Sequence, residues 1–202
     1  MKIQLRFADA EKDASKVLAI YAPYILNTTI TFEYEVPSLE AFQRRMEGVM
    51  EQFPWIVCEV DGVVAGYAYA AKQYERAAYG WNAELSVYLS PEFQGAGIGS
   101  ALYRALIGVL QIQGYRNASV RITIPNEKSI ALHQAFGFEP VGTFHSVGNK
   151  FGRWLDMQCL TKQIGEYSEF PSPPQPASML NKEITDALFS ACTQQIRVCA
   201  RR

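Results

Sequence analysis

A run of small residues between a predicted strand and a predicted helix is the part of this sequence best suited to hold a phosphate group. The run is Gln94-Gly95-Ala96-Gly97-Ile98-Gly99-Ser100. Glycine lets the backbone approach a ligand closely, and the free N–H groups and dipole of a helix N-terminus attract phosphate. The alternative is a tight strand-to-helix turn whose glycines serve packing alone. The glycines by themselves leave both interpretations open.

The spacing of this run excludes two common phosphate-binding motifs. A P-loop needs a lysine directly after its last glycine, and none stands there. A dinucleotide fingerprint would need glycine where Ser100 stands, and belongs in an N-terminal βαβ unit.

The same run resembles motif A of the GNAT acetyltransferase superfamily, Q/R-x-x-G-x-G/A, through Gln94, Gly97 and Gly99. Pro125-Asn126 and Gly137-Phe138 match the next motif of that superfamily. Residues 83–89, 132–138 and 147–156 are similar to the narrower family of phosphinothricin N-acetyltransferase-like enzymes. The resemblance covers residues 3–160. It implies a GNAT fold, acetyl-CoA as co-substrate without a metal, and a homodimer formed through the C-terminal part.

Two side chains at matched positions could move protons during acetyl transfer. An alkyl ammonium titrates near pH ~10 and must lose a proton before it attacks a thioester. Glu84 stands where the family's proposed general base stands, on the strand before the glycine run. His133 replaces the tyrosine that protonates the leaving thiolate in most GNAT enzymes, as it does in the phosphinothricin-type enzymes, with an acid or base role left open. The alternative for Glu84 is a half-exposed strand carboxylate without a catalytic role, and that for His133 is a helix histidine satisfied by hydrogen bonds. His145 matches no catalytic position and is interpreted as structural.

The resemblance places the cofactor in a splay between residues 87–89 and the strand at 118–124. Backbone groups of the first strand would pair with pantetheine, and a main-chain N–H could polarise the thioester carbonyl. Asn126 could bind the pantetheine amides, cap the helix that it begins, or do both. The predicted cofactor-binding residues are Val87, Tyr88, Leu89, Gln94, Gly95, Ala96, Gly97, Ile98, Gly99, Ser100 and Asn126.

Four residues are candidates for binding the acceptor. Arg76 aligns with a family arginine and could pair with a substrate carboxylate, although a solvated loop charge is an equal alternative. Phe32, Glu33 and Tyr79 fall on segments that line the acceptor pocket in the family. The implied acceptors are small amino-acid analogues of the phosphinothricin, methionine sulfoximine or methionine sulfone type.

The hydrophobic pattern predicts the elements that position these residues. It indicates a mixed, splayed sheet flanked by helices in the order βααβββαβαββ, an α+β fold. Strands are predicted at 3–7, 55–60, 63–70, 81–89, 118–124, 141–147 and 154–160, with helix caps at Asp9, Ser38 and Gly137. Residues 1–165 form the predicted acetyltransferase domain. Residues 166–202 form a proline-rich linker and an appendage with helical potential, either mobile or packed on a partner subunit.

Composition and charge indicate which partners and which cellular compartment to expect. The chain has 202 residues, 19 Lys and Arg against 20 Asp and Glu, and a net charge of -1. No global charge therefore favours nucleic acid or an anionic membrane as partner. Cys58, Cys159, Cys192 and Cys199 lack metal-ligand or disulfide spacing, and no apolar run has the length of a membrane span. These features predict a cytoplasmic protein with free thiols.

Three functions fit the sequence. The first is acetyl transfer to a small amine in a ternary complex, with Glu84 and His133 as proton carriers. The second keeps that chemistry but takes a protein amine, such as a ribosomal N-terminus, as acceptor. The third is a CoA-binding module without catalysis, which the presence of Glu84 beside the glycine run disfavours.

Overall fold

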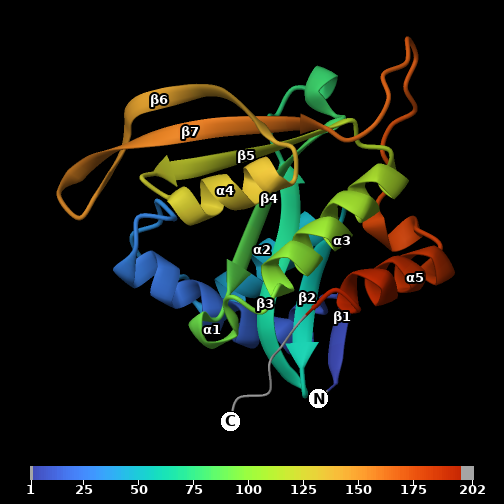
Figure 1. Ribbon diagram of the computed structural model, residues 1–202, viewed down its shortest axis with the longest axis horizontal. Coiled ribbons are helices and arrows are strands. Elements are labelled where there is room, and N and C mark those ends of the chain that lie inside the picture. Colours follow the sequence, from blue (N-terminus) through green and yellow to red (C-terminus); the bar gives the residue numbers. More distant parts are fainter. Residues whose placement is uncertain (1, 197–202) are drawn as a thin grey trace.

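The computed structural model describes residues 2–196 as a seven-stranded mixed sheet with helices on both faces (Figure 1). The elements follow the predicted order βααβββαβαββ, with one further helix in the C-terminal segment. They are β1 (Ile3–Phe7), α1 (Ala10–Asn27), α2 (Leu39–Met50), β2 (Trp55–Val60), β3 (Val63–Lys72), β4 (Asn82–Leu89), α3 (Ile98–Gln113), β5 (Asn117–Ile124), α4 (Glu127–Ala135), β6 (Glu139–Lys150), β7 (Arg153–Gln163) and α5 (Lys182–Thr193).

The sheet has the strand order β1-β2-β3-β4-β5-β7-β6, and every neighbouring pair except β4–β5 is antiparallel. Strand alternation divides the core into two clusters. In β2, Ile56 and Cys58 pack with α3, whereas Trp55 and Val57 pack with α1 and α2. The sheet thus lies between two apolar layers, as expected for strands buried on both faces.

Local signals for helix ends are confirmed. Asp9 accepts hydrogen bonds from the Glu11 and Lys12 amides at the start of α1, and Ser38 accepts one from the Ala41 amide at the start of α2. Gly137 has φ +78° just after α4, which is the left-handed conformation of a C-terminal cap.

The last two strands are longer than predicted. The sequence suggests a connection at Gly148 to Gly152, but β6 runs on to Lys150 and the turn is confined to Phe151 and Gly152. Gly148 lies in the strand opposite Leu155, and it is a glycine because a Cβ there would lie 2.3 Å from the Phe32 ring. The glycine marks a close contact between segments and not a break in the strand.

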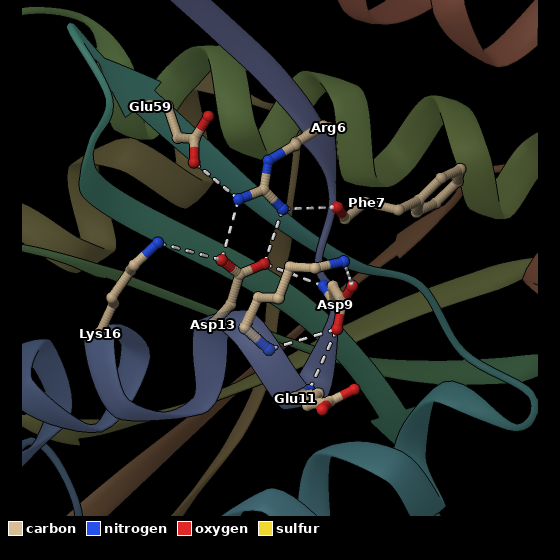
Figure 2. Close-up of polar contacts among 8 residues, drawn as sticks. Arg6, Phe7, Asp9, Glu11, Asp13, Lys16 and Glu59 are labelled. Atoms are coloured by element: carbon tan, nitrogen blue, oxygen red, sulfur yellow. Dashed lines mark hydrogen bonds and ion pairs between the residues drawn. The ribbon is translucent and has the colours of Figure 1, made fainter.

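A buried ion pair fastens α1 to the edge of the sheet (Figure 2). The Arg6 guanidinium of β1 donates to both carboxylate oxygens of Asp13, at 2.6 and 2.8 Å, and to Glu59 of β2 at 2.7 Å. Burial alone would raise the pKa of Asp13, but the bonds from Arg6 and the Asp9 amide hold that pKa below its usual value. The Asp13 side chain is 0% exposed and that of Arg6 28%, so the Asp13 carboxylate is sealed from water, whereas the guanidinium is partly exposed.

The C-terminal segment lies against its own chain. Figure 1 shows α5 beside α3, and α5 contacts both α3 and β1. Phe189 is buried edge-to-face on Phe7, with ring centroids 5.0 Å apart, and Leu188 packs on Gly108. The proline-rich stretch before α5 is held by backbone bonds such as Gln175 N–H to Gln113 O at 2.9 Å. Cys199 and Val198 lie outside the described residues.

Within residues 2–196 no helix is long and apolar enough to cross a membrane. Nor does that part of the chain gather three or more His, Cys, Asp or Glu side chains in a group suited to a metal ion.

Candidate active site

Strands β4 and β5 separate partway along their length. They pair in parallel only where Asn82, Ala83 and Glu84 face Asn117, Ala118 and Ser119, although both strands continue. From Leu85 onward, no described strand pairs with the β5-facing edge of β4. A cavity of about 70 Å³ opens in the splay. Its lining includes four residues predicted to bind cofactor or move protons, namely Val87, Tyr88, Asn126 and His133.

The glycine run leads into α3 at the end of this splay. Gly95 and Gly97 both have φ +81°, which L side chains rarely adopt, and Gly97 is the N-cap of α3 without a side-chain cap. The N–H groups of the first helical turn are therefore free to bind an anion. Gly99 also serves packing, because a Cβ there would lie 3.2 Å from a Leu89 methyl. The missing side chain permits a close approach of α3 to β4.

Glu84 is held in a bidentate ion pair with Arg121 of β5. Arg121 Nε donates to one Glu84 oxygen at 2.9 Å, and Nη2 donates to the other in a shorter contact. The pair raises the pKa of Arg121. The Glu84 side chain is 19% exposed and that of Arg121 47%, so this pair is open to solvent. No sequence signal marks Arg121 as part of the site, because a lone arginine on a strand resembles a solvated charge.

His133 is buried in α4 with a defined tautomer. Its Nδ1 lies 2.7 Å from the Ser129 carbonyl oxygen, which can only accept, so Nδ1 carries the hydrogen. The other nitrogen, Nε2, then has a free lone pair when the ring is neutral. Burial lowers the pKa of His133, partly opposed by the bond to Ser129, and this keeps the ring neutral at pH 7.

Two hydrogen bonds shape the edges of the splay. Asn126 Oδ1 accepts from the Ser129 amide at 3.2 Å and so caps α4, while the residue also lines the cavity. The Tyr24 hydroxyl donates to the Leu89 carbonyl oxygen at 2.6 Å and fixes the end of β4. The helical spacing of Tyr24 predicts only a core residue of the first helix.

The segment bearing Phe32 and Glu33 is clamped to the β6–β7 hairpin. Lys150 is 1% exposed and donates to the Thr31 carbonyl oxygen at 2.7 Å. Burial lowers the pKa of this lysine. The Glu33 carboxylate accepts from Arg45 at 2.7 Å and from the Tyr21 hydroxyl at 3.1 Å. No sequence signal marks Lys150 as buried, since its partner is a backbone oxygen far away in the chain.

Arg76 and Tyr79 lie on the exposed connection between β3 and β4. Tyr79 packs on Tyr74 with ring centroids 4.7 Å apart. Tyr74 lines a second cavity, of about 490 Å³, whose wall also includes Arg121. Within residues 2–196, Arg76 forms no ion pair. The structure thus brings Glu84, His133 and Asn126 to one splay, with Arg76 on the loop that precedes it.

A parallel pair of strands that separates beside an uncapped helix N-terminus is the arrangement that the resemblance to acetyltransferases implies for an acyl-CoA site. Residues 7–159 match the acetyltransferase (GNAT) domain, and the chain belongs to this family.

Three relatives narrow the comparison. A crystal structure of a GNAT superfamily phosphinothricin acetyltransferase from Sinorhizobium meliloti, in complex with acetyl-CoA, is 36% identical with a TM-score of 0.81, covering 89% of this chain and 98% of that one. An L-methionine sulfoximine/L-methionine sulfone acetyltransferase from Salmonella typhimurium is 32% identical over 81% of this chain and 96% of its own length. A crystal structure of a ribosomal-protein-alanine N-acetyltransferase from Brucella melitensis is 34% identical with a TM-score of 0.76. The match covers 79% of this chain and 98% of that one.

Proposed function

We propose that this acetyltransferase moves an acetyl group from acetyl-CoA to the primary amine of a small amino-acid analogue, by direct attack in a ternary complex. The observation that carries the proposal is the splay between β4 and β5, with Glu84 at the point where the strands part. The acceptors are of the phosphinothricin, methionine sulfoximine or methionine sulfone type. An N-acetylated analogue no longer carries a free amine, so detoxification is the role that we infer.

The residues around the splay fit acetyl-CoA. The unpaired edge of Val87 to Leu89 offers backbone donors and acceptors to the pantetheine amides, and Asn126 lies across the cavity. The left-handed Gly95 and Gly97 and the uncapped start of α3 offer N–H groups to the pyrophosphate. When bound there, acetyl-CoA supplies an acetyl group activated as a thioester.

Glu84 and His133 carry the protons in this proposal. Glu84 takes a proton from the substrate ammonium, directly or through water, so that the amine nitrogen gains a free lone pair. His133 is neutral with Nε2 as acceptor, so it receives the second proton that the amine nitrogen releases as the C–N bond forms, and passes it to the thiolate that leaves when the C–S bond breaks. In this proposal His133 acts first as a base and then as an acid within one turnover.

The acceptor side consists of Phe32, Glu33, Arg76 and Tyr79. The clamp between Lys150 and Thr31 fixes the segment of the first two. Because Arg45 and Tyr21 occupy the Glu33 carboxylate, we propose that Glu33 shapes the pocket wall and does not bind the amine itself. Arg76 and Tyr79 approach from the connection before β4.

One assay tests the function. Thiol release from acetyl-CoA is measured with phosphinothricin, methionine sulfone, methionine sulfoximine, ordinary amino acids, polyamines and a peptide with an N-terminal alanine. We expect the amino-acid analogues to give the highest kcat/KM. The similarity to the ribosomal-protein-alanine N-acetyltransferase from Brucella melitensis makes the peptide the second candidate acceptor. Preference for the peptide would replace the proposal, and cofactor binding without thiol release from any amine would identify a non-catalytic module.

We further propose that the enzyme is a cytoplasmic homodimer. Large apolar side chains stand exposed at the turn between β6 and β7, namely Phe151 at 55% and Trp154 at 68%. A patch of this kind is usual at subunit interfaces. Cys58, Cys159 and Cys192 are free thiols, as in a reducing compartment. The molar mass measured by light scattering coupled to gel filtration should be twice that of one chain. Trp154→Asp should shift the measured mass toward that of the monomer, and a monomeric wild type would refute the dimer.

A further inference from the structure

Arg121 stands between two cavities and has an unused binding edge. It lines both the cavity of the β4–β5 splay and the larger cavity of about 490 Å³. Its register partner on β7 is Cys159, and Met157, Cys159 and Thr161 line the larger cavity on the same face of the sheet. A group bound in the larger cavity beside Arg121 would therefore lie next to the splay.

The guanidinium uses only part of its donors on Glu84. Arginine has five N–H donors, and the Nε and Nη2 side of the fork faces the two Glu84 oxygens. Within residues 2–196, Nη1 donates to no acceptor. The edge formed by Nη1 and the second hydrogen of Nη2 can therefore hold another carboxylate in bidentate geometry.

The walls of the larger cavity indicate what such a ligand looks like. Among the described residues that line it, Arg121 alone carries a charge. Apolar side chains make up much of the rest, including Val141, Phe144, Val147 and Met157, with hydroxyls of Ser119, Thr143 and Thr161. This combination of residues fits a small ligand that has one anionic group and a short, mainly apolar side chain.

We propose that Arg121 binds the α-carboxylate of the acceptor amino acid on its free edge while its other edge holds Glu84. This inference rests on the proposed function and names the residue that selects α-amino acids. In an α-amino acid the ammonium is attached to the carbon that bears the carboxylate. A carboxylate on one edge of Arg121 thus brings the ammonium close to Glu84 on the neighbouring edge, where its proton passes to a Glu84 oxygen. The exposed Arg76 then contributes less to carboxylate binding than Arg121.

The test compares methionine sulfone with 3-(methylsulfonyl)propylamine, the same molecule without its carboxylate. In the wild type the amino acid should have the higher kcat/KM. In Arg121→Ala the amino acid should lose about 100-fold in kcat/KM, chiefly through KM, whereas the amine changes by less than about fivefold. Arg121→Lys should recover part of the loss, because lysine keeps the charge but not the fork. Arg44→Ala, which removes an arginine from an exposed pair with Glu40, is the matched control and should change neither substrate.

Several outcomes would overturn the proposal. Equal losses for both substrates in Arg121→Ala would mean that Arg121 serves Glu84 or the fold alone. A selective loss for the amino acid in Arg76→Ala, without one in Arg121→Ala, would assign the carboxylate to Arg76. If Arg121→Ala does not fold, wild-type enzyme assayed with methionine sulfone amide decides instead: a kcat/KM equal to that of the acid refutes carboxylate binding. A wild type that acetylates neither substrate would refute the proposed function itself, which is a separate result.

Discussion

Two arginine–carboxylate pairs in this protein use the same chemistry in opposite surroundings. Arg6 holds Asp13 in a bidentate pair whose carboxylate is 0% exposed, with Glu59 as a second partner. Arg121 holds Glu84 in the same bidentate manner, but its own side chain is 47% exposed and lines two cavities. The first pair joins β1, α1 and β2. The second joins β4 and β5 at the point where they separate.

The difference between the pairs lies in what surrounds them. In the sealed pair every Asp13 oxygen is satisfied within the protein, and removal of one partner leaves a buried charge without compensation. In the open pair the Glu84 carboxylate is itself 19% exposed and two cavities adjoin Arg121, so substrate can reach both partners, and such a pair adds little to stability. We therefore expect substitutions in the sealed pair to change the free energy of unfolding, and substitutions in the open pair to change turnover.

The largest expected effect is that of Glu84→Gln on turnover. Glutamine can still accept a hydrogen bond from Arg121 but cannot take up a proton, so kcat should fall by about 10²- to 10⁴-fold. Acetyl-CoA affinity, measured by calorimetry, and the melting temperature should remain nearly unchanged. Glu59→Gln, the matched change beside Arg6, should keep kcat. Unchanged turnover in Glu84→Gln would remove Glu84 from the mechanism.

The next effect concerns His133 and its dependence on pH. Because burial lowers the pKa of His133, Nε2 remains an acceptor down to pH values below about 6.5, and kcat should fall only under that value. His133→Gln should reduce kcat by about 10²-fold. The only other histidine is His145, so the ring-proton resonances in an NMR titration can be assigned with His145→Gln, which should keep full activity. A His133 resonance that titrates above 6.5 would contradict the assignment.

The smallest effect on activity should come from the sealed pair. Asp13→Asn is expected to lower the free energy of unfolding by about 2 kcal/mol, seen in urea denaturation, with kcat per folded molecule unchanged. The pKa of Asp13 is lowered in the folded state, so its contribution is present above about pH 4 and is lost as pH falls further. Asp13→Asn should therefore lose less stability than the wild type between neutral pH and pH 3. An equal loss in both proteins would show that the pair does not contribute.

Prediction from sequence succeeded where the signal is local. The hairpin of 55–60 and 63–70 and the caps at Asp9, Ser38 and Gly137 each depend on residues close by in the chain. Prediction failed at Gly148, where the reason for the glycine is the ring of Phe32 from a distant segment. The roles of Glu84, His133 and Asn126 remain proposals, although the structure brings these residues to one splay.

The sequence by itself thus determined the order of elements and the resemblance to the GNAT family, and it predicted a phosphate site at the glycine run. Only the tertiary structure decided which charges meet. Arg121 faces Glu84 because β5 lies parallel to β4 in a register that pairs Glu84 with Ser119, and Lys150 is buried because the β6–β7 hairpin folds over Thr31. The physical reason is that backbone conformation follows from neighbours in the chain, whereas the partner of a charged side chain is set by strand register and by exclusion of water.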